Sequence, residues 1–379
     1  MNKVRISKNS RCPCGSGKRF GKCCRAKRLI VEEVARCFRD QDNRRREYFE
    51  RHGHSRVPVC TKFGDKWVVA VGGGIYKQTQ EGPYGFMSAI HDHALVFFGD
   101  SFLEAEEEKL FLERHPAIQW MHTCVEHNQR LRDEGNMDPR AGQIGSGAAW
   151  FRFAYDLFTI QDNAKLEARL KERLLDQRSF QASRYELRIA ALCVAAGFEL
   201  QFEDEQDNSR QHPEFIATDK LSSAKIAVEV KSRHRKGVQG FKGGLDIQPG
   251  DQVDIRKPIM EAYKKISTLP FYVFVDTNLP PIADDTVWKK WMCEIDKTMS
   301  DLQAEGYADP CPANIVFFSN DPSHYLAEEQ IGNRRDNVWM KPYKATSPRV
   351  QHTATDMEER FLKAHAQRLV PPANFPDFQ

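Results

Sequence analysis

The segment Lys225-Ile-Ala-Val-Glu-Val-Lys231 has the alternating pattern of a β-strand. Side chains alternate along a strand, so Val228 and Val230 face one side of it. Glu229 and Lys231 face the opposite side and place two ionisable groups on one face of an otherwise apolar segment. A pattern of Glu-x-Lys also arises by chance, and a surface ion pair on an exposed sheet face would explain it equally well.

Strand and helix patterns alternate on both sides of this stretch, which favours an α/β (α+β) fold. The Gly-rich segment at about 235–250 is expected to be a loop, since glycine favours turns over regular elements. The elements expected in chain order are a helix over 182–196, strands over 198–202, 214–218 and 225–231, a helix over 258–266, a strand over 271–276, a helix over 285–304 and a last strand over 314–318.

Four regions differ in pattern along the 379 residues, a length that allows two or three domains. Within the second region, we expect a β segment over 56–71 and helices over roughly 86–133 and 147–176. The four regions are a basic, Cys-rich segment over 1–27, a mainly helical middle domain over 28–180, the α/β domain over 181–345 and a tail with one helix over 346–379.

The composition sets limits on the class of protein. A hydrophobic content of 40% suffices for a core, and a net charge of +3 does not by itself indicate a nucleic-acid binder. No apolar stretch approaches the ~20 residues that a spanning helix needs. The N-terminal segment lacks the apolar run of a secretory signal, and most cysteines are scattered, as in a reducing compartment. We therefore expect a soluble, cytoplasmic protein with no membrane partner.

Four cysteines stand close together near the N-terminus: Cys12, Cys14, Cys23 and Cys24. Two pairs of thiolates can complete a tetrahedral zinc shell with no open position, which predicts a structural site and no catalysis by this metal. So short a segment cannot bury a core, so the metal would supply the folding energy. The glycines between the pairs allow the positive φ values of a metal-wrapping loop: Gly15, Gly17 and Gly21. The alternative is four unpaired or disulfide-linked cysteines.

The run Cys12-Pro-Cys14-Gly-Ser-Gly-Lys-Arg-Phe-Gly-Lys-Cys23-Cys24 strongly resembles the SEC-C motif, named from the C-terminus of the bacterial preprotein translocase ATPase. In that family the pattern is Cys-x-Cys-x8-Cys-Cys/His, with Gly-Ser-Gly-Lys after the second ligand. The resemblance implies a small docking module for a protein or ribosome-like partner.

Three further features add to the Glu-x-Lys pattern. Glu214 opens the preceding expected strand, and an antiparallel pairing would bring its carboxylate beside Glu229. Glu186 lies in an otherwise apolar part of the helix over 182–196. The chain also turns basic directly after Lys231.

This order resembles the PD-(D/E)xK phosphodiesterase superfamily, the restriction-endonuclease-like fold, over about residues 182–280. The family's helical Glu corresponds to Glu186, its acidic strand residue to Glu214, and its Glu-x-Lys to Glu229 and Lys231. Glu214 departs from the usual Pro-Asp by standing as Pro-Glu. The resemblance implies a central mixed sheet and a metal-dependent nuclease.

The chemistry expected from these residues is phosphodiester hydrolysis. Glu214 and Glu229 would hold Mg²⁺ or Mn²⁺, which would polarise the scissile phosphate and activate a water. Lys231 would stabilise the developing negative charge, while Glu186 would bind a second metal or orient water. Basic residues would contact backbone phosphates: Arg233, Arg235, Lys236, Lys242 and Arg256.

The sequence therefore predicts a magnesium-dependent endonuclease with a zinc docking module. DNA is favoured over RNA as the nucleic-acid partner, and defence against foreign DNA or repair is the setting suggested by family analogy. A ribonuclease of the same chemistry and a non-catalytic nucleic-acid- or protein-binding adaptor are the alternatives. The middle domain would recognise substrate, form a homodimer or sense a trigger.

Overall fold

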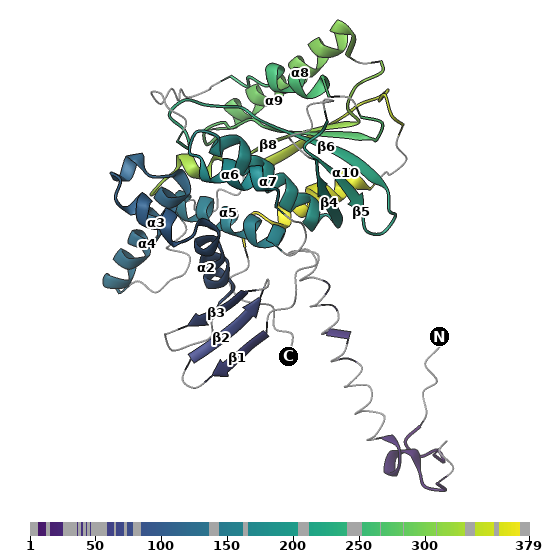
Figure 1. Cartoon of the computed structure of the whole chain (residues 1–379). Helices are drawn as coiled ribbons and strands as arrows, with labels where there is room; N and C mark the ends of the chain where they lie inside the picture. Colours follow the sequence, from purple (N-terminus) through teal and green to yellow (C-terminus); the bar gives the residue numbers. More distant parts are fainter. Residues whose placement is uncertain are drawn as a thin grey trace. The chain divides into compact units, whose positions relative to one another are not determined.

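The protein is described here from a computed structural model (Figure 1). The chain divides into two compact units, Met1–Phe49 with Pro376–Gln379, and Glu50–Phe375. The structure describes residues 7–12, 16–25, 36, 39–40, 43, 46, 59–63, 66–71, 74–78, 85–135, 144–161, 166–203, 212–240, 252–265, 267–282, 284–307, 309–329, 338–351 and 356–371.

A six-stranded mixed sheet organises the larger unit. Its strands lie in the order β4-β5-β6-β7-β8-β9. The first three are antiparallel neighbours, β6, β7 and β8 run parallel, and β9 is antiparallel to β8. The bounds are β4 Phe198–Phe202, β5 Phe215–Asp219, β6 Lys225–Ser232, β7 Phe271–Asp276, β8 Ile315–Asn320 and β9 Trp339–Lys344. The expected mixed α/β architecture is thus confirmed.

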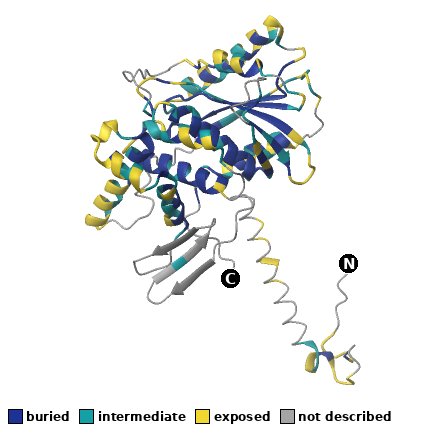
Figure 2. Ribbon diagram, in the orientation of Figure 1, coloured by how far each residue is buried: buried dark blue, intermediate teal, exposed yellow. Residues whose placement is uncertain are grey.

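Helices cover both faces of this sheet (Figure 1). On one face, Val228 and Val230 join a hydrophobic core with α5 (Gly145–Gln161), α7 (Phe180–Ala195) and α10 (Met357–Gln367). On the other face, Ala227 joins a second core with α8 (Arg256–Tyr263) and α9 (Asp285–Leu302). Figure 2 shows the central strands buried between these layers. Every residue of β7 and β8 is buried, as expected for parallel strands that are covered on both faces.

The remaining helices extend the first core. Phe86 and Trp150 are part of the same cluster of buried side chains as Phe180 and Val228. The helices over 86–175 and the sheet therefore share one hydrophobic core, while the predicted boundary near residue 180 stays a prediction. The bounds are α2 Phe86–Phe98, α3 Asp100–Glu107, α4 Pro116–Asp133 and α6 Ala168–Leu175, with short turns at Phe20–Lys22, Phe111–Glu113, Gln303–Tyr307 and Pro322–Tyr325.

Two strands were not expected from the sequence. β1 (Val59–Phe63) and β2 (Lys66–Val71) form the expected antiparallel pair, and β3 (Gly74–Gln78) adds a third strand beside β2. The expectation that 314–318 is the last strand is wrong, because β9 follows it at the sheet edge. None of the described helices combines the length and the apolar character needed to cross a membrane.

Candidate metal centres

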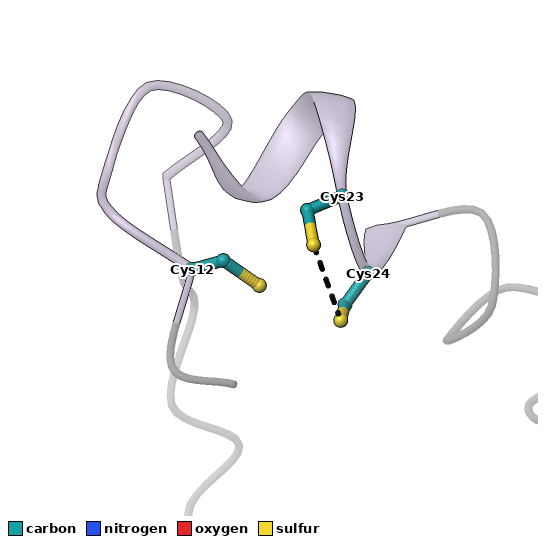
Figure 3. Close-up of side chains that lie close together, drawn as sticks. All are labelled: Cys12, Cys23 and Cys24. Carbon is teal, nitrogen blue, oxygen red and sulfur yellow. Dashed lines mark hydrogen bonds between the residues drawn. The ribbon is translucent and has the colours of Figure 1, made fainter. Parts of the chain in front are cut away.

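The N-terminal cysteines form the first candidate site (Figure 3). The sulfurs of Cys12, Cys23 and Cys24 all lie within 4.8 Å of one another, and Cys14 lies outside the described residues. The Cys23 and Cys24 sulfurs are 3.7 Å apart. Tetrahedral zinc with Zn–S bonds of about 2.3 Å separates its sulfurs by about 3.8 Å, whereas a disulfide joins them at about 2.05 Å. The arrangement therefore fits a structural zinc site.

Backbone contacts hold the loop around these sulfurs. The Gly21 N–H donates to Lys8 O at 2.9 Å. A Cβ at Gly21 would lie 3.0 Å from that oxygen, so glycine is needed here because the two backbone segments approach closely. The sequence-based expectation that Gly21 adopts a positive φ is wrong. Gly17 does adopt a positive φ of 71°. Ser16 Oγ lies 3.0 Å from Cys23 Sγ, a contact of the kind that orients a metal ligand and that the sequence did not reveal.

The second candidate site lies where β5 and β6 pair. Phe215 lies opposite Val228, and the Glu214 N–H donates to Val228 O at 3.0 Å. The ladder therefore continues one residue beyond β5 and brings Glu214 beside Glu229. Both carboxylates reach one ammonium, because Lys231 Nζ lies 2.6 Å from Glu229 Oε1 and 3.7 Å from Glu214 Oε1. The structure thus brings Glu214, Glu229 and Lys231 together.

Burial gives the carboxylate of Glu229 unusual properties. It is 0% exposed, and the pKa of Glu229 is raised to about 7, first by burial and then by the charge of Glu214. Lys231 and Lys265 oppose this rise. Burial alone would lower the pKa of Lys231, but the carboxylates of Glu229 and Glu214 outweigh it and raise that pKa.

One oxygen of this buried carboxylate is left for a ligand. Within the described part of the chain, Glu229 Oε2 has no hydrogen-bond partner. An unpaired buried carboxylate oxygen is costly, since it has lost water without a replacement. Together with Glu214, it offers the hard oxygen ligands that Mg²⁺ and Mn²⁺ prefer.

The structure adds a second lysine to this site, and that lysine was not among the residues expected from the sequence. Lys265 follows α8, and its Nζ lies 4.0 Å from Glu229 Oε1. Its neighbour Lys264 is exposed. The sequence does not show which of two adjacent lysines at the end of a helix points toward the sheet. That depends on how α8 packs over β6.

Glu186 is placed differently from the other expected catalytic residues. It lies on α7, which covers the sheet face opposite to α8, and it is 5% exposed. Its Oε2 lies 2.8 Å from Arg173 Nη2. No described contact links it to Glu229, so its role in the site stays a prediction.

The expected phosphate contacts differ in their surroundings. Arg235 is 9% exposed and its Nη1 donates to Asn278 O at 3.4 Å, so it is enclosed by protein. Arg233 is half-buried and donates to Gln252 O at 2.7 Å. Lys236 is exposed, Arg256 pairs with Glu305 at the surface, and Lys242 lies outside the described residues.

Comparison with known proteins reaches only the first site. Residues 9–26 match the family model of the SEC-C motif, which confirms that part of the resemblance. Neither the curated proteins nor the solved structures yield a match to this chain.

Proposed function

We propose that the α/β unit is a metal-dependent nuclease that hydrolyses phosphodiester bonds, with DNA as the favoured substrate. The observation that carries this proposal is the convergence of Glu214, Glu229 and Lys231, with Lys231 2.6 Å from one carboxylate and 3.7 Å from the other. A surface ion pair would not need a fully buried glutamate whose second oxygen lacks a described partner.

The order and pairing of the surrounding elements support the same reading. A helix, three antiparallel strands, a second helix and a strand parallel to the third follow one another as α7-β4-β5-β6-α8-β7. The restriction-endonuclease-like resemblance implies this order, with its acidic residue and Glu-x-Lys on the second and third strands. β5 and β6 bring those groups to one place.

The donor set fits a hard divalent cation. Glu214 and Glu229 would hold Mg²⁺ or Mn²⁺, and the raised pKa of Glu229 means that cation binding must compete with a proton near neutral pH. A bound cation would supply polarisation of the scissile phosphate and a water of lowered pKa.

The two lysines, Lys231 and Lys265, would have different roles toward the substrate phosphate. Both now contact Glu229 Oε1, so a cation that takes up the carboxylate charge would leave both ammonium groups available to an anionic substrate. Lys231, between the two carboxylates, would stabilise charge that develops on the reacting phosphate. Lys265, at the end of α8, would anchor the phosphate in the ground state.

The test is cleavage of plasmid DNA, single-stranded DNA and structured RNA in parallel, each with Mg²⁺ and with Mn²⁺. We expect metal-dependent cleavage by the wild type and a loss of about 10²–10³-fold in Lys231→Ala. Lys264→Ala is the control, because Lys264 is exposed and lies next to Lys265 in the sequence; this variant should keep full activity. A wild type that cleaves none of these substrates would overturn the proposal.

The same experiment separates the alternatives. Cleavage of RNA alone would identify a ribonuclease of the same chemistry. Nucleic-acid binding without cleavage would identify an adaptor. The SEC-C segment would in each case serve as a separate docking module for a protein partner.

A further inference from the structure

A small cavity lies between α5, α7 and α10. The space open to the centre of a water-sized sphere is about 10 Å³, which is enough for one water molecule or a single-atom ion. Three guanidinium groups and one carboxylate give the lining a net positive charge. The lining residues are Arg152, Asp156, Arg188, Leu192, His365 and Arg368.

The guanidinium groups are held in place from behind. Arg152 Nη1 lies 2.7 Å from Asp321 Oδ1, and Arg188 bonds to the other oxygen of the same carboxylate. Arg368 Nη2 lies 2.6 Å from Asp156 Oδ1. The three arginine side chains are only 6% to 13% exposed, so they cannot turn out into water. The cavity is therefore lined by a fixed arrangement of positive charges.

His365 adds an unsatisfied group to this lining. It is 7% exposed, and its Nε2 has no hydrogen-bond partner among the described residues. Its pKa is lowered to about 3, first by burial and then by Arg188 and Arg152, although Asp321 acts in the opposite direction. The ring is therefore neutral, and a buried ring nitrogen without a partner destabilises the fold unless a ligand hydrogen-bonds to it.

We propose that this cavity binds a small monovalent inorganic anion of the size of chloride. With Asp321 and Asp156 both counted, three guanidinium groups still face only two carboxylates, and this excess of buried positive charge favours an anion over water. So small a space suits a single-atom anion better than a nucleotide or a whole phosphate group. The His365 N–H would donate to the anion beside Arg188 and Arg368. The anion would join three helices and fix α10, the last described helix of the chain, against α7.

The first test compares thermal unfolding in sodium chloride and in sodium gluconate at equal ionic strength. We expect a saturable rise in Tm of about 2 °C in chloride at tenfold excess over the dissociation constant, and the same in bromide. His365→Phe keeps the ring but removes the donor, so the chloride effect should vanish. Lys363→Met, at an exposed position of α10, should keep it.

The second test locates the ion directly and does not depend on a variant. Crystals of the full chain grown with bromide should show an anomalous peak between Arg188, Arg368 and His365. A water in that position, or equal Tm values in chloride and gluconate at every concentration, would overturn the proposal. Neither test involves Glu229, so the outcome is independent of the proposed nuclease activity.

Discussion

The molecule offers two candidate metal sites that are built in opposite ways. The sulfurs of Cys12, Cys23 and Cys24 gather in a segment whose described residues bury one large apolar side chain, Phe20. Glu214 and Glu229 instead sit on a sheet that is already held by two hydrophobic cores. We expect the first site to need its metal in order to fold, whereas at the second site the sheet is already folded and holds charged groups in a buried, unfavourable position.

Because the two sites are built differently, substitutions should affect local folding at the first site and cation binding at the second. A soft, closed shell contributes its binding free energy to local folding and leaves no position for a substrate. A hard, incomplete set of oxygens on a rigid sheet would instead cost stability and leave coordination positions open to a substrate. Each of the following predictions separates these two behaviours.

The largest effect is expected on removing Cys12, a candidate zinc ligand. In Cys12→Ser the segment 7–25 should lose its structure, because the apparent free energy of zinc binding in such modules is about 10–16 kcal/mol. The main unfolding transition should stay within about 1 °C of the wild type, since the sheet has its own core. NMR spectra, zinc content and calorimetry measure these quantities. Cys293→Ser, at an exposed cysteine on α9, is the control; a folded segment in metal-free Cys12→Ser would contradict the expectation.

The second effect concerns binding of a divalent cation at Glu229. At pH 8, Mn²⁺ should raise the Tm of the wild type, and Glu229→Gln should lose this response together with roughly 10³-fold in cleavage. Calorimetric titration with Mn²⁺ alone reads out binding even where no substrate is cleaved. Glu199→Gln, at an exposed position of β4, should bind as the wild type does. Unchanged Mn²⁺ affinity in Glu229→Gln would remove this residue from the metal site.

The third effect is on the pH dependence of stability. The folded-state pKa of Glu229 is raised from 4.5 to about 7, so the folded chain binds a proton that the unfolded chain has released. Stability should therefore fall as pH rises from about 5 to 8, by up to about 3 kcal/mol at 1.36 kcal/mol per pKa unit. Glu229→Gln should remove most of this fall and exceed the wild type in stability at pH 8. Urea unfolding across this pH range measures it, and parallel curves for the two proteins would show that Glu229 is not responsible.

How far the sequence reached follows the same division. The clustering of Cys12, Cys23 and Cys24 could be predicted because these residues are close in sequence, so spacing alone brings their sulfurs together. Glu214 and Glu229 could be predicted because their strands are neighbours along the chain and pair in an antiparallel ladder. The strands β4 and β7 have the residue ranges expected from the sequence, because each carries a clear local apolar pattern.

The sequence failed where distant segments decide the structure. β9 contains Pro342, and a proline is not expected in a central strand because it cannot donate a hydrogen bond to its neighbour. An edge strand such as β9 tolerates it. The local sequence does not show that 339–344 lies at an edge, so this strand was missed. Lys265 joins Glu229 only through the docking of α8, and the sequence does not show which sheet face α7 covers, hence where Glu186 lies. Pairings that depend on packing between layers carry no local pattern.

The smallest effect tests this last kind of contact. Lys265→Met should raise the KM for a short DNA substrate about tenfold and leave kcat within about threefold, because a ground-state phosphate contact of about 1.4 kcal/mol is lost. The salt dependence of binding, measured with Ca²⁺ in place of Mg²⁺, should lose about 0.9 from its logarithmic slope. Lys264→Met is the matched control, one residue away and exposed, and Lys265→Arg should restore most of the affinity. Since only the inward lysine approaches Glu229, equal effects of the two Met substitutions would mean that the contact at 4.0 Å has no part in substrate binding, even if the wild type cleaves DNA.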